Sequence, residues 1–555
     1  MTGEAMTMKF DYIVVGAGPA GCVVANRLTE DPRVSVCLIE AGPPDTHAFI
    51  KMPAGFIKTL ENPNLTWRFE TMPTSRTNNR ALVIKQGRVL GGSSAVNGMV
   101  YTRGLPSDFD RWASLGNRGW AFADVLPYFK KSEKWFGSNP EGLRGDSGPL
   151  GITPNDWRND ICDAFIDNAI AMGFQHNADY NGSTQEGVGY CQRFIERGRR
   201  TTAFGAYIKP VRGRSNLKVM TSTTVTKILL DGKTAVGVAV RRPKSTLPAT
   251  ISAAREVVLA AGTVNTARLL QVSGIADPNL LSKIGVPLAH PLPGVGEHLR
   301  DHYVIRTVAR VRGGTTINEL TQGRRLAMQV LRWVFRQPSV LGVSPSLINL
   351  FFRSDTNLVE PDLQGVFAPA SYKIGAYGVL DTAPGISLGV WQHRPQSHGF
   401  VHATSDDIDV SPLVQPNYLD HEGDRNVLLA GLRFARQVLQ GPVLKQYFVE
   451  ELLPGSRIET DDAVLDYAYR YGASAGHLVG TARMGPSDDP MAVVGPDLLV
   501  HGLSSLRVID ASVMPTLPSA NTMATVLMIG EKAAELMRAR TDPNGGRLRG
   551  TGWAS

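Results

Sequence analysis

Three glycines near the start of the chain have the spacing of a phosphate-binding turn. They lie in the run Gly16-Ala17-Gly18-Pro19-Ala20-Gly21. Gly16 permits a tight turn, Gly18 lets a pyrophosphate approach the backbone, and Gly21 lets the following helix pack against the preceding strand. The N-terminus of that helix offers free N–H groups and a partial positive charge to the phosphates.

The residues around this turn complete a dinucleotide-binding unit. Apolar runs at 10–15 and 34–39 predict buried strands, and the small and apolar residues at 22–28 have helical spacing. Glu40 follows the second strand, where a carboxylate accepts hydrogen bonds from ribose hydroxyls. A strand, a turn, a helix, a second strand and an acid in this order favour dinucleotide binding over a purely structural glycine-rich turn.

A second glycine-rich stretch follows at 87–98, Gly87-Arg88-Val89-Leu90-Gly91-Gly92-Ser93-Ser94-Ala95-Val96-Asn97-Gly98. Two glycines followed by two serines can form a backbone nest that binds an anion and opens a helix. An ordinary loop is the alternative interpretation on spacing alone.

Continued through Tyr101, Gly104 and Asp110, this stretch resembles the first signature of the glucose–methanol–choline (GMC) family of FAD-dependent oxidoreductases. Residues 262–267 with Ser273-Gly274-Ile275 resemble the second signature, although Ala267 and Ala276 replace the usual Ser or Pro and the usual Gly. Further similar segments are 293–299 with Asp301-His302, Arg394-Pro395 and Asn417-Tyr418-Leu419. The resemblance covers the chain from about residue 10 to about residue 540.

The resemblance and the apolar patterns together predict an α/β fold in two parts. A Rossmann-like FAD-binding domain, discontinuous in sequence, is expected from residues 8–155, 195–300 and 466–540. A smaller α+β substrate-binding domain, built on an antiparallel sheet, is expected from 156–194 and 301–465. Residues 43–80, rich in Pro, Asn and Thr, are predicted to be an extended loop or lid, and 541–555 a flexible tail.

The resemblance identifies His477 as the base and Asn521 as its polar neighbour. His477 stands before a Gly-Thr…Met-Gly turn, and Asn521 stands 11 positions before Lys532 of the last helix, as in the family. Without the resemblance, one histidine among eleven is more often structural. Alcohol oxidation removes a hydroxyl proton, for which His is suited, and sends a hydride from the same carbon to flavin N5. Asn can donate a hydrogen bond to the developing alkoxide.

The resemblance also assigns the residues that bind FAD. They are Gly16, Gly18, Pro19, Ala20, Gly21, Glu40, Ala41, Trp67, Arg88, Gly91, Gly92, Ser93, Asn97, Gly98, Met99, Val100, Val225, Ala261, Gly262, Asp510, Ala511, Asn521 and Thr522. Some family members attach FAD through a His in the glycine loop, but Val96 occupies that position here, so noncovalent FAD is expected.

The predicted reaction is oxidation of an alcohol, primary and aromatic or furanic, to the aldehyde, with oxygen or a quinone or cytochrome as electron acceptor. The segment around His477 and Asn521 looks more like that of hydroxymethylfurfural and aryl-alcohol oxidases than of choline dehydrogenases, where Pro commonly replaces Leu478. Choline-type and polyethylene-glycol dehydrogenases remain alternatives, as do the family's hydroxynitrile lyases and fatty-acid photodecarboxylase. Aromatic residues at 333, 351, 352, 367, 372 and 391 are candidates for a substrate pocket or for the core.

Composition excludes several other classes of protein. The net charge is +8, but the basic residues are scattered, and the densest run, Arg193 to Arg214, is interpreted as a solvated face rather than a nucleic-acid site. Four cysteines without a C-x-x-C pair predict neither a disulfide framework nor a metal site. No secretory signal and no membrane span are apparent, so a cytoplasmic enzyme is expected.

Overall fold

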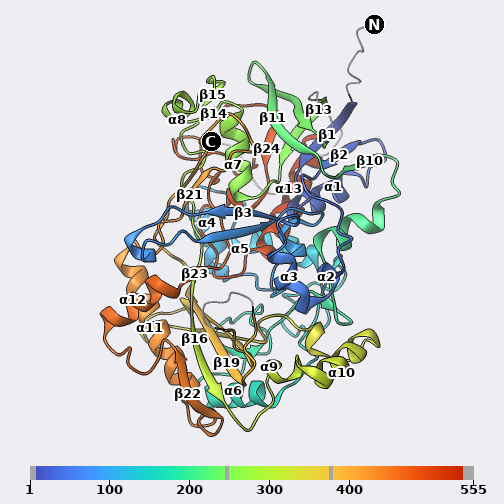
Figure 1. The fold of residues 1–555 in the computed structure, drawn as a ribbon. Helices are drawn as coiled ribbons and strands as arrows, with labels where there is room; N and C mark the ends of the chain where they lie inside the picture. The colour runs from blue at the N-terminus through green and yellow to red at the C-terminus, as the bar shows by residue number, and fades with distance from the viewer. Residues whose placement is uncertain (1–7, 244–248, 374–378, 542–555) are drawn as a thin grey trace.

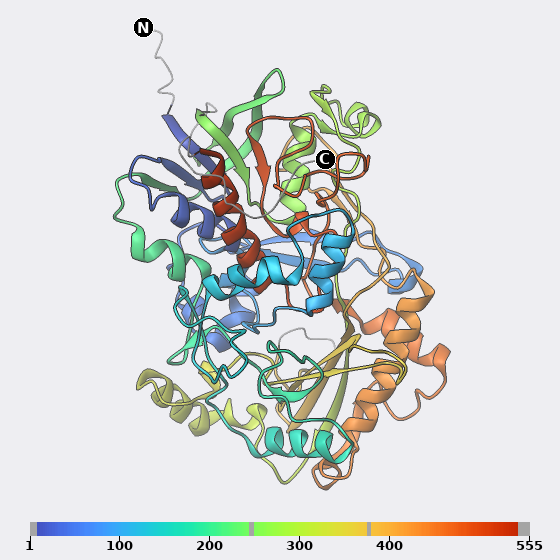
Figure 2. The same ribbon diagram turned by 180° about the vertical axis from the view of Figure 1, so that it is seen from behind.

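The computed structural model describes residues 8–243, 249–373 and 379–541, and its two seven-stranded β-sheets lie in two stacked parts (Figure 1). The N-terminal strands and the C-terminal helix lie in the same part, and the middle of the chain forms the other (Figures 1 and 2). Among the described residues, no helix is long and apolar enough to cross a membrane.

The first sheet has a parallel core and an antiparallel edge. The parallel strands, in order, are β10 (Leu217–Met220), β2 (Val36–Ile39), β1 (Met8–Val15), β13 (Ala249–Leu259) and β24 (Leu506–Val508). The hairpin of β11 (Thr224–Asp231) and β12 (Thr234–Arg241) pairs antiparallel with the first half of β13. All four residues of β2 are buried, as expected for a parallel strand covered on both faces.

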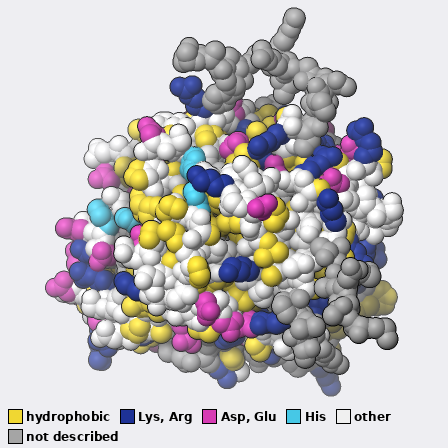
Figure 3. All heavy atoms as spheres, turned by 90° about the horizontal axis from the view of Figure 1, so that it is seen from above, with side chains coloured by type: hydrophobic (Ala, Val, Ile, Leu, Met, Phe, Trp, Pro, Cys, Tyr) yellow, Lys and Arg dark blue, Asp and Glu magenta, His cyan; other side chains and the backbone are white. Residues whose placement is uncertain are grey.

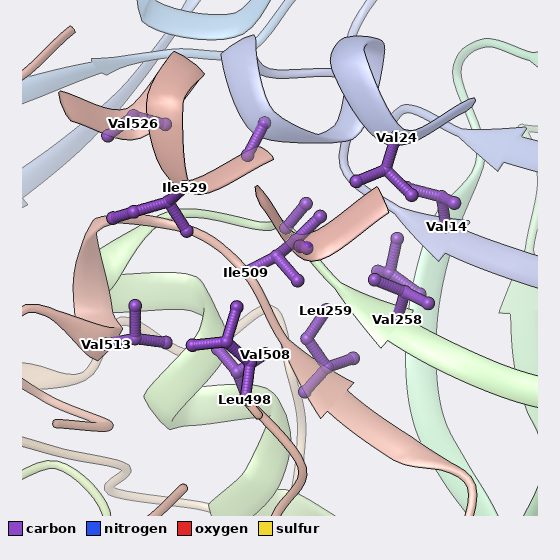
Figure 4. Close-up of a cluster of buried hydrophobic side chains, with 14 of the residues drawn as sticks. Val14, Val24, Val258, Leu259, Leu498, Val508, Ile509, Val513, Val526 and Ile529 are labelled. Atoms are coloured by element: carbon purple, nitrogen blue, oxygen red, sulfur yellow. The ribbon is translucent and has the colours of Figure 1, made fainter. Parts of the chain in front are cut away.

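Helices cover this sheet and bring the two ends of the chain together. Helix α1 (Pro19–Leu28) packs against α13 (Met523–Thr541), which in turn packs against α5 (Phe122–Ser132). Branched and aliphatic side chains from α1, α13, β1, β13 and β24 interlock in one buried cluster (Figure 4). The glycine-rich turn after β1 is therefore held by segments from both ends of the sequence.

The second sheet is antiparallel. Its order is β22 (Phe448–Leu453), β16 (Tyr303–Val311), β19 (Gly385–Gln392), β18 (Leu363–Ala368), β17 (Ile348–Phe352) and β7 (Gly187–Tyr190), and β23 (Ala473–Ser474) also pairs with β16. Helices α11 (Glu422–Leu439) and α6 (Asp160–Ala171) share its apolar core. The strand alternation leaves the other side chains of β16, β18 and β19 pointing away from that core.

The remaining regular elements are helices of three to twelve residues and strands of two to five residues. They are α2 (Ala48–Lys51), η1 (Pro53–Gly55), α3 (Phe56–Leu60), β3 (Thr66–Glu70), η2 (Ser75–Thr77), β4 (Val83–Gly87), η3 (Gly92–Ala95), α4 (Pro106–Ser114), β5 (Glu133–Trp135), β6 (Leu150–Ile152), β8 (Ile195–Glu196), β9 (Arg199–Arg200), η4 (Phe204–Ile208), η5 (Lys209–Val211), α7 (Thr263–Val272), β14 (Ile275–Ala276), α8 (Pro278–Lys283), β15 (His290–Pro291), α9 (Ile317–Leu320), α10 (Gly323–Val334), η6 (Val340–Gly342), β20 (Phe400–His402), β21 (Leu413–Gln415), η7 (Leu444–Gln446), α12 (Asp461–Tyr471) and η8 (Ala511–Val513).

The structure confirms the predicted fold class, a Rossmann-like part beside an antiparallel sheet. The prediction of a loop over 43–80 is wrong, because this segment contains α2, α3 and β3, and β3 pairs with β4. Trp67 and Phe69 of β3 pack on neighbouring segments, which orders a stretch whose composition suggests a loop. The predicted boundary at 465/466 lies inside α12, whose Tyr467 and Ala468 join the core of the second sheet. The domain boundaries stay a proposal, and 542–555 of the predicted tail lie outside the described residues.

The densest basic run is a solvated face only in part, because Arg197, Arg199 and Arg212 are exposed whereas two other arginines of the run are not. Arg193 and Arg200 are buried, and Arg200 donates hydrogen bonds to the backbone oxygens of Ile50, Ser94 and Asn97. These arginines therefore tie loops together. Elsewhere the basic side chains are spread among acidic and apolar ones, as the face in Figure 3 shows. The four cysteines are all buried and free, and the described residues contain no cluster of potential metal ligands.

Candidate active site

The glycine-rich turn between β1 and α1 leaves no room for a side chain at Gly16 or Gly21. Gly16 has φ +103°, and a Cβ there would lie 2.4 Å from the Ala260 carbonyl oxygen. A Cβ at Gly21 would lie 2.0 Å from the oxygen of Gly16. No side chain caps the N-terminus of α1, so its first amide groups are available to an anion.

The second glycine-rich stretch lies directly on this turn. Gly91 donates its N–H to the Ala17 oxygen at 2.9 Å, and a Cβ on Gly92 would lie 2.7 Å from the Cα of Gly18. At Gly92 the chain begins the short helix η3. The two motifs predicted separately from the sequence thus form one continuous backbone surface.

Two buried carboxylates hold the backbone around this surface. Glu40 accepts hydrogen bonds from the amides of Ala17 (3.0 Å) and Gly42 (2.8 Å), and burial raises the pKa of its side chain to about 7. Asp510 accepts from the amide of Gly262 (2.8 Å) at the start of α7, and burial raises its pKa too.

One cavity of about 1190 Å³ extends from these loops to the second sheet. Of the predicted site residues, all but Gly21, Arg88 and Gly91 line it. Those three residues lie behind the cavity wall. Gly21 and Gly91 contact the backbones of Gly16 and Ala17, and the Arg88 guanidinium lies 4.6 Å from the ring centre of Trp67. Val96 lines the cavity as well. Of the candidate aromatic residues, Tyr372 and Trp391 line it, whereas Phe352 and Phe367 belong to the core.

His477 and Asn521 meet where the two parts of the molecule face each other. Asn521 Nδ2 lies 3.1 Å from His477 Nε2, and Thr102 Oγ1 donates to Asn521 Oδ1 at 3.1 Å. On the other side of the ring, His477 Nδ1 lies 2.9 Å from His302 Nδ1. Asp301 accepts the backbone N–H of His477 at 2.6 Å, which fixes the loop.

The hydrogen-bond chain fixes the tautomer of His477. His302 Nε2 lies 2.7 Å from the His393 carbonyl oxygen, which can only accept, so this nitrogen carries the proton. Neutral His302 then presents a lone pair at Nδ1, and His477 must donate to it from its own Nδ1. In neutral His477 the remaining nitrogen, Nε2, is therefore unprotonated. It faces the Asn521 amide at the cavity wall.

Burial keeps this histidine pair neutral. It lowers the pKa of His477 to about 4, and it lowers the pKa of His302 well below its usual value, with the nearby His477 adding to the effect. At neutral pH Nε2 therefore carries a lone pair, which faces the Asn521 amide and can accept a proton from a bound hydroxyl.

His302 and Thr102 are absent from the predicted set. The Asp301-His302 pair stands out in the sequence as part of the resemblance, but nothing local indicates that His302 contacts a ring 175 positions away. Thr102 lies 419 positions from Asn521. Only the fold brings these groups together.

The wall opposite the glycine loops is the open face of the second sheet. Val304, Arg306 and Val308 alternate along β16 and line the cavity, as do Ser387, Gly389 and Trp391 of β19. The centres of the Trp391 and His477 rings are 6.1 Å apart. Arg306 pairs in register with Gly389, where the missing side chain leaves room for the arginine stem. It is the one charged side chain on an otherwise apolar and neutral wall of described β16, β18 and β19 residues.

Comparison with known proteins identifies the family. Residues 10–304 and 395–530 match two family models described as GMC oxidoreductase. Oxygen-dependent choline dehydrogenases of Photobacterium profundum and Brucella ovis are each 36% identical, over 97% and 96% of this chain and 94% and 96% of theirs. The solved pyridoxine 4-oxidase from Mesorbium loti is 29% identical, with a TM-score of 0.86 over 95% of this chain and 99% of that one. A formate oxidase, at 24% identity and a TM-score of 0.89 over 96% and 99%, shares the fold.

The chain belongs to the GMC oxidoreductase family, and the resemblance stated from the sequence is confirmed. It is an FAD-dependent enzyme that oxidises alcohols. The cavity fits this cofactor: an uncapped helix start faces it, as does the Glu40 carboxylate, and their positions suit a pyrophosphate and a ribose. The buried Nε–H of Arg268, at the cavity wall, has no hydrogen-bond partner within the described part of the chain, so it can serve an anionic or polar ligand.

Proposed function

We propose that the enzyme oxidises an uncharged or anionic primary alcohol, aromatic or furanic, to the aldehyde, with His477 as the base. The observation that carries this proposal is the hydrogen-bond chain that leaves His477 Nε2 unprotonated beside the Asn521 amide. FAD, held noncovalently, supplies the hydride acceptor. The noncovalent state is supported by Val96, which has no nucleophilic atom where some relatives carry His.

Asn521, His477 and His302 have separate roles in the proposed proton transfer. The substrate hydroxyl binds within hydrogen-bond reach of both Asn521 Nδ2 and His477 Nε2, so that its proton passes to Nε2 while the amide stabilises the alkoxide oxygen. As the imidazolium forms, its Nδ1–H donates a charge-assisted hydrogen bond to His302. A base whose pKa is as low as that of His477 depends on this support, because burial disfavours its charged form.

The charges around the cavity argue against choline as the substrate, although the curated relatives are named for it. Aromatic faces, which Trp391 and Tyr372 supply in this cavity, attract a quaternary ammonium group, and a free carboxylate would add the charge complementarity that choline needs. Glu40 and Asp510 are bonded to backbone amides, and Glu61, the third acid at the cavity, forms ion pairs with Lys85 and Arg68. Arg306, by contrast, has no carboxylate partner among the described residues. Gly389, the residue opposite Arg306 on the neighbouring strand, lies two residues from Trp391 along β19. At strand spacing, two residues correspond to about 7 Å.

The test is anaerobic and in the dark. Benzyl alcohol, 5-hydroxymethylfurfural, 4-(hydroxymethyl)benzoate and choline are added separately to the holoenzyme, and the flavin absorbance is followed. We expect benzyl alcohol, 5-hydroxymethylfurfural and 4-(hydroxymethyl)benzoate to bleach the flavin, and choline to bleach it most slowly. Faster bleaching by choline would refute the substrate class, and no dark bleaching by any alcohol would favour a lyase or a photoenzyme.

Admitting air to the reduced enzyme identifies the electron acceptor. We propose oxygen or a quinone or cytochrome in this role, in a cytoplasmic enzyme. Rapid return of the flavin colour with peroxide identifies an oxidase. Slow return identifies a dehydrogenase, whose partner is then sought by adding quinones.

A further inference from the structure

Helix α10 presents its apolar side chains outward. Met328, Leu331 and Val334 are 56%, 52% and 54% exposed, and Phe335, directly after the helix, is 71% exposed. Spacings of three and four residues place them on one face. Most surface helices turn this face to the core, so an exposed one calls for a partner.

The inner face of α10 is held mainly by polar contacts. Gln329, the one buried residue of the helix, accepts hydrogen bonds from Ser339 Oγ (2.8 Å) and from the Val340 amide (3.2 Å). The indole of Trp333 donates to the Gly198 oxygen at 2.7 Å. The helix is thus fixed in its present rotation, and its apolar face cannot turn inward without breaking these bonds.

Basic residues flank the exposed apolar face. Arg324, Arg325, Arg332 and Arg336 lie on or directly after the helix, and the sequence contains no Asp or Glu from residue 320 to residue 354. Only Arg325 has an ion pair among the described residues, with Glu319 at 3.4 Å. Figure 1 shows α10 at the outer edge of the second part, and Figure 2 shows it there again from behind.

We propose that α10 is an interfacial helix that docks the enzyme on an anionic membrane surface. Apolar side chains enter the boundary between headgroups and acyl chains, and arginines at the flank contact the negatively charged headgroups. The combination of an outward apolar face and uncompensated positive charge is what such a surface recognises. A second copy of this chain would meet the same cationic patch and be repelled by it.

Vesicle binding by the holoenzyme tests this proposal. The enzyme is mixed with phosphatidylcholine vesicles, with or without phosphatidylglycerol, and separated by flotation. We expect binding to the phosphatidylglycerol vesicles only, with weakening as salt is added. The double variant Leu331→Ser/Phe335→Ser should lose most of this binding. Replacing Arg324, Arg332 and Arg336 by Gln should weaken it roughly hundredfold, at about fivefold for each cation.

Matched variants separate docking from damage to the fold. Leu288→Ser/Val359→Ser removes two apolar side chains that are 52% and 94% exposed elsewhere, and it should bind vesicles like the parent enzyme. All variants should keep their flavin absorbance and their turnover in detergent-free buffer. Failure of the parent to bind anionic vesicles would overturn the proposal. So would a concentration-dependent dimer in sedimentation that Leu331→Ser/Phe335→Ser abolishes, because the face would then belong to a second copy.

Discussion

Replacing His302 by Phe removes the acceptor for His477 Nδ1–H while keeping a ring of similar size in a buried site. The 2.9 Å contact between the two rings is lost, and the His393 carbonyl oxygen loses its donor. The charge-assisted hydrogen bond to the forming imidazolium is worth about 1.5–3 kcal/mol. At 1.4 kcal/mol per tenfold, kcat should fall roughly 10–100-fold. KM should change little, because His302 does not line the cavity.

The assay is steady-state turnover with a bleaching alcohol, together with flavin content and thermal unfolding. His302→Gln is the conservative rescue, because its amide can accept from His477 and donate to the His393 oxygen. It should recover most of the activity. His398→Phe makes the same substitution at an exposed histidine and should change nothing. A His302→Phe enzyme that is less stable yet keeps its kcat would refute the positioning role.

Burial lowers the pKa of His477 to about 4, and the neutral ring is the base. The value of kcat/KM should therefore stay level above about pH 5 and fall as the pH drops through 4. A fall of kcat/KM that begins near pH 6.5 would contradict this prediction. Gly92→Ala places a Cβ 2.7 Å from Gly18 Cα and should lower the affinity for FAD at least tenfold. The control Gly285→Ala is also at positive φ but in open space, so it should leave FAD binding intact. Equal flavin loss in both variants would contradict the close approach of the loops. Arg306→Glu should raise the ratio of kcat/KM for choline to that for 4-(hydroxymethyl)benzoate more than tenfold. Arg312 lies outside the cavity lining, so Arg312→Glu should leave this ratio unchanged. An unchanged ratio in the Arg306→Glu enzyme would contradict the role of Arg306.

The sequence predicts the parts of this site that depend on local pattern. Gly16, Gly18, Gly21 and Glu40 are recognisable because the turn, the helix start and the strand end lie within one short βαβ unit. The antiparallel second sheet is predicted from alternation along its strands. His477 and Asn521 require the family resemblance, since nothing in their own neighbourhoods distinguishes them from structural polar residues.

The remaining features arise from contacts that are distant in sequence. The tautomer of His477 depends on His302 and on the carbonyl of His393, which come from a different part of the chain. The burial of Arg193 and Arg200 depends on loops that pack around them and accept several of their guanidinium hydrogen bonds. The order within 43–80 depends on the pairing of β3 with β4, which overrides a composition typical of loops. In each case tertiary packing decides what local composition leaves open.

Anaerobic reduction of the flavin by a primary aromatic alcohol in the dark tests the central claim most directly, with the parent enzyme and His477→Ala compared at neutral pH. The account predicts rapid bleaching by the parent and a rate about 10²–10⁴-fold lower in the variant, the usual contribution of a general base. Equal bleaching rates in the two enzymes, with flavin bound in both, would contradict the assignment of His477 as the group that accepts the hydroxyl proton.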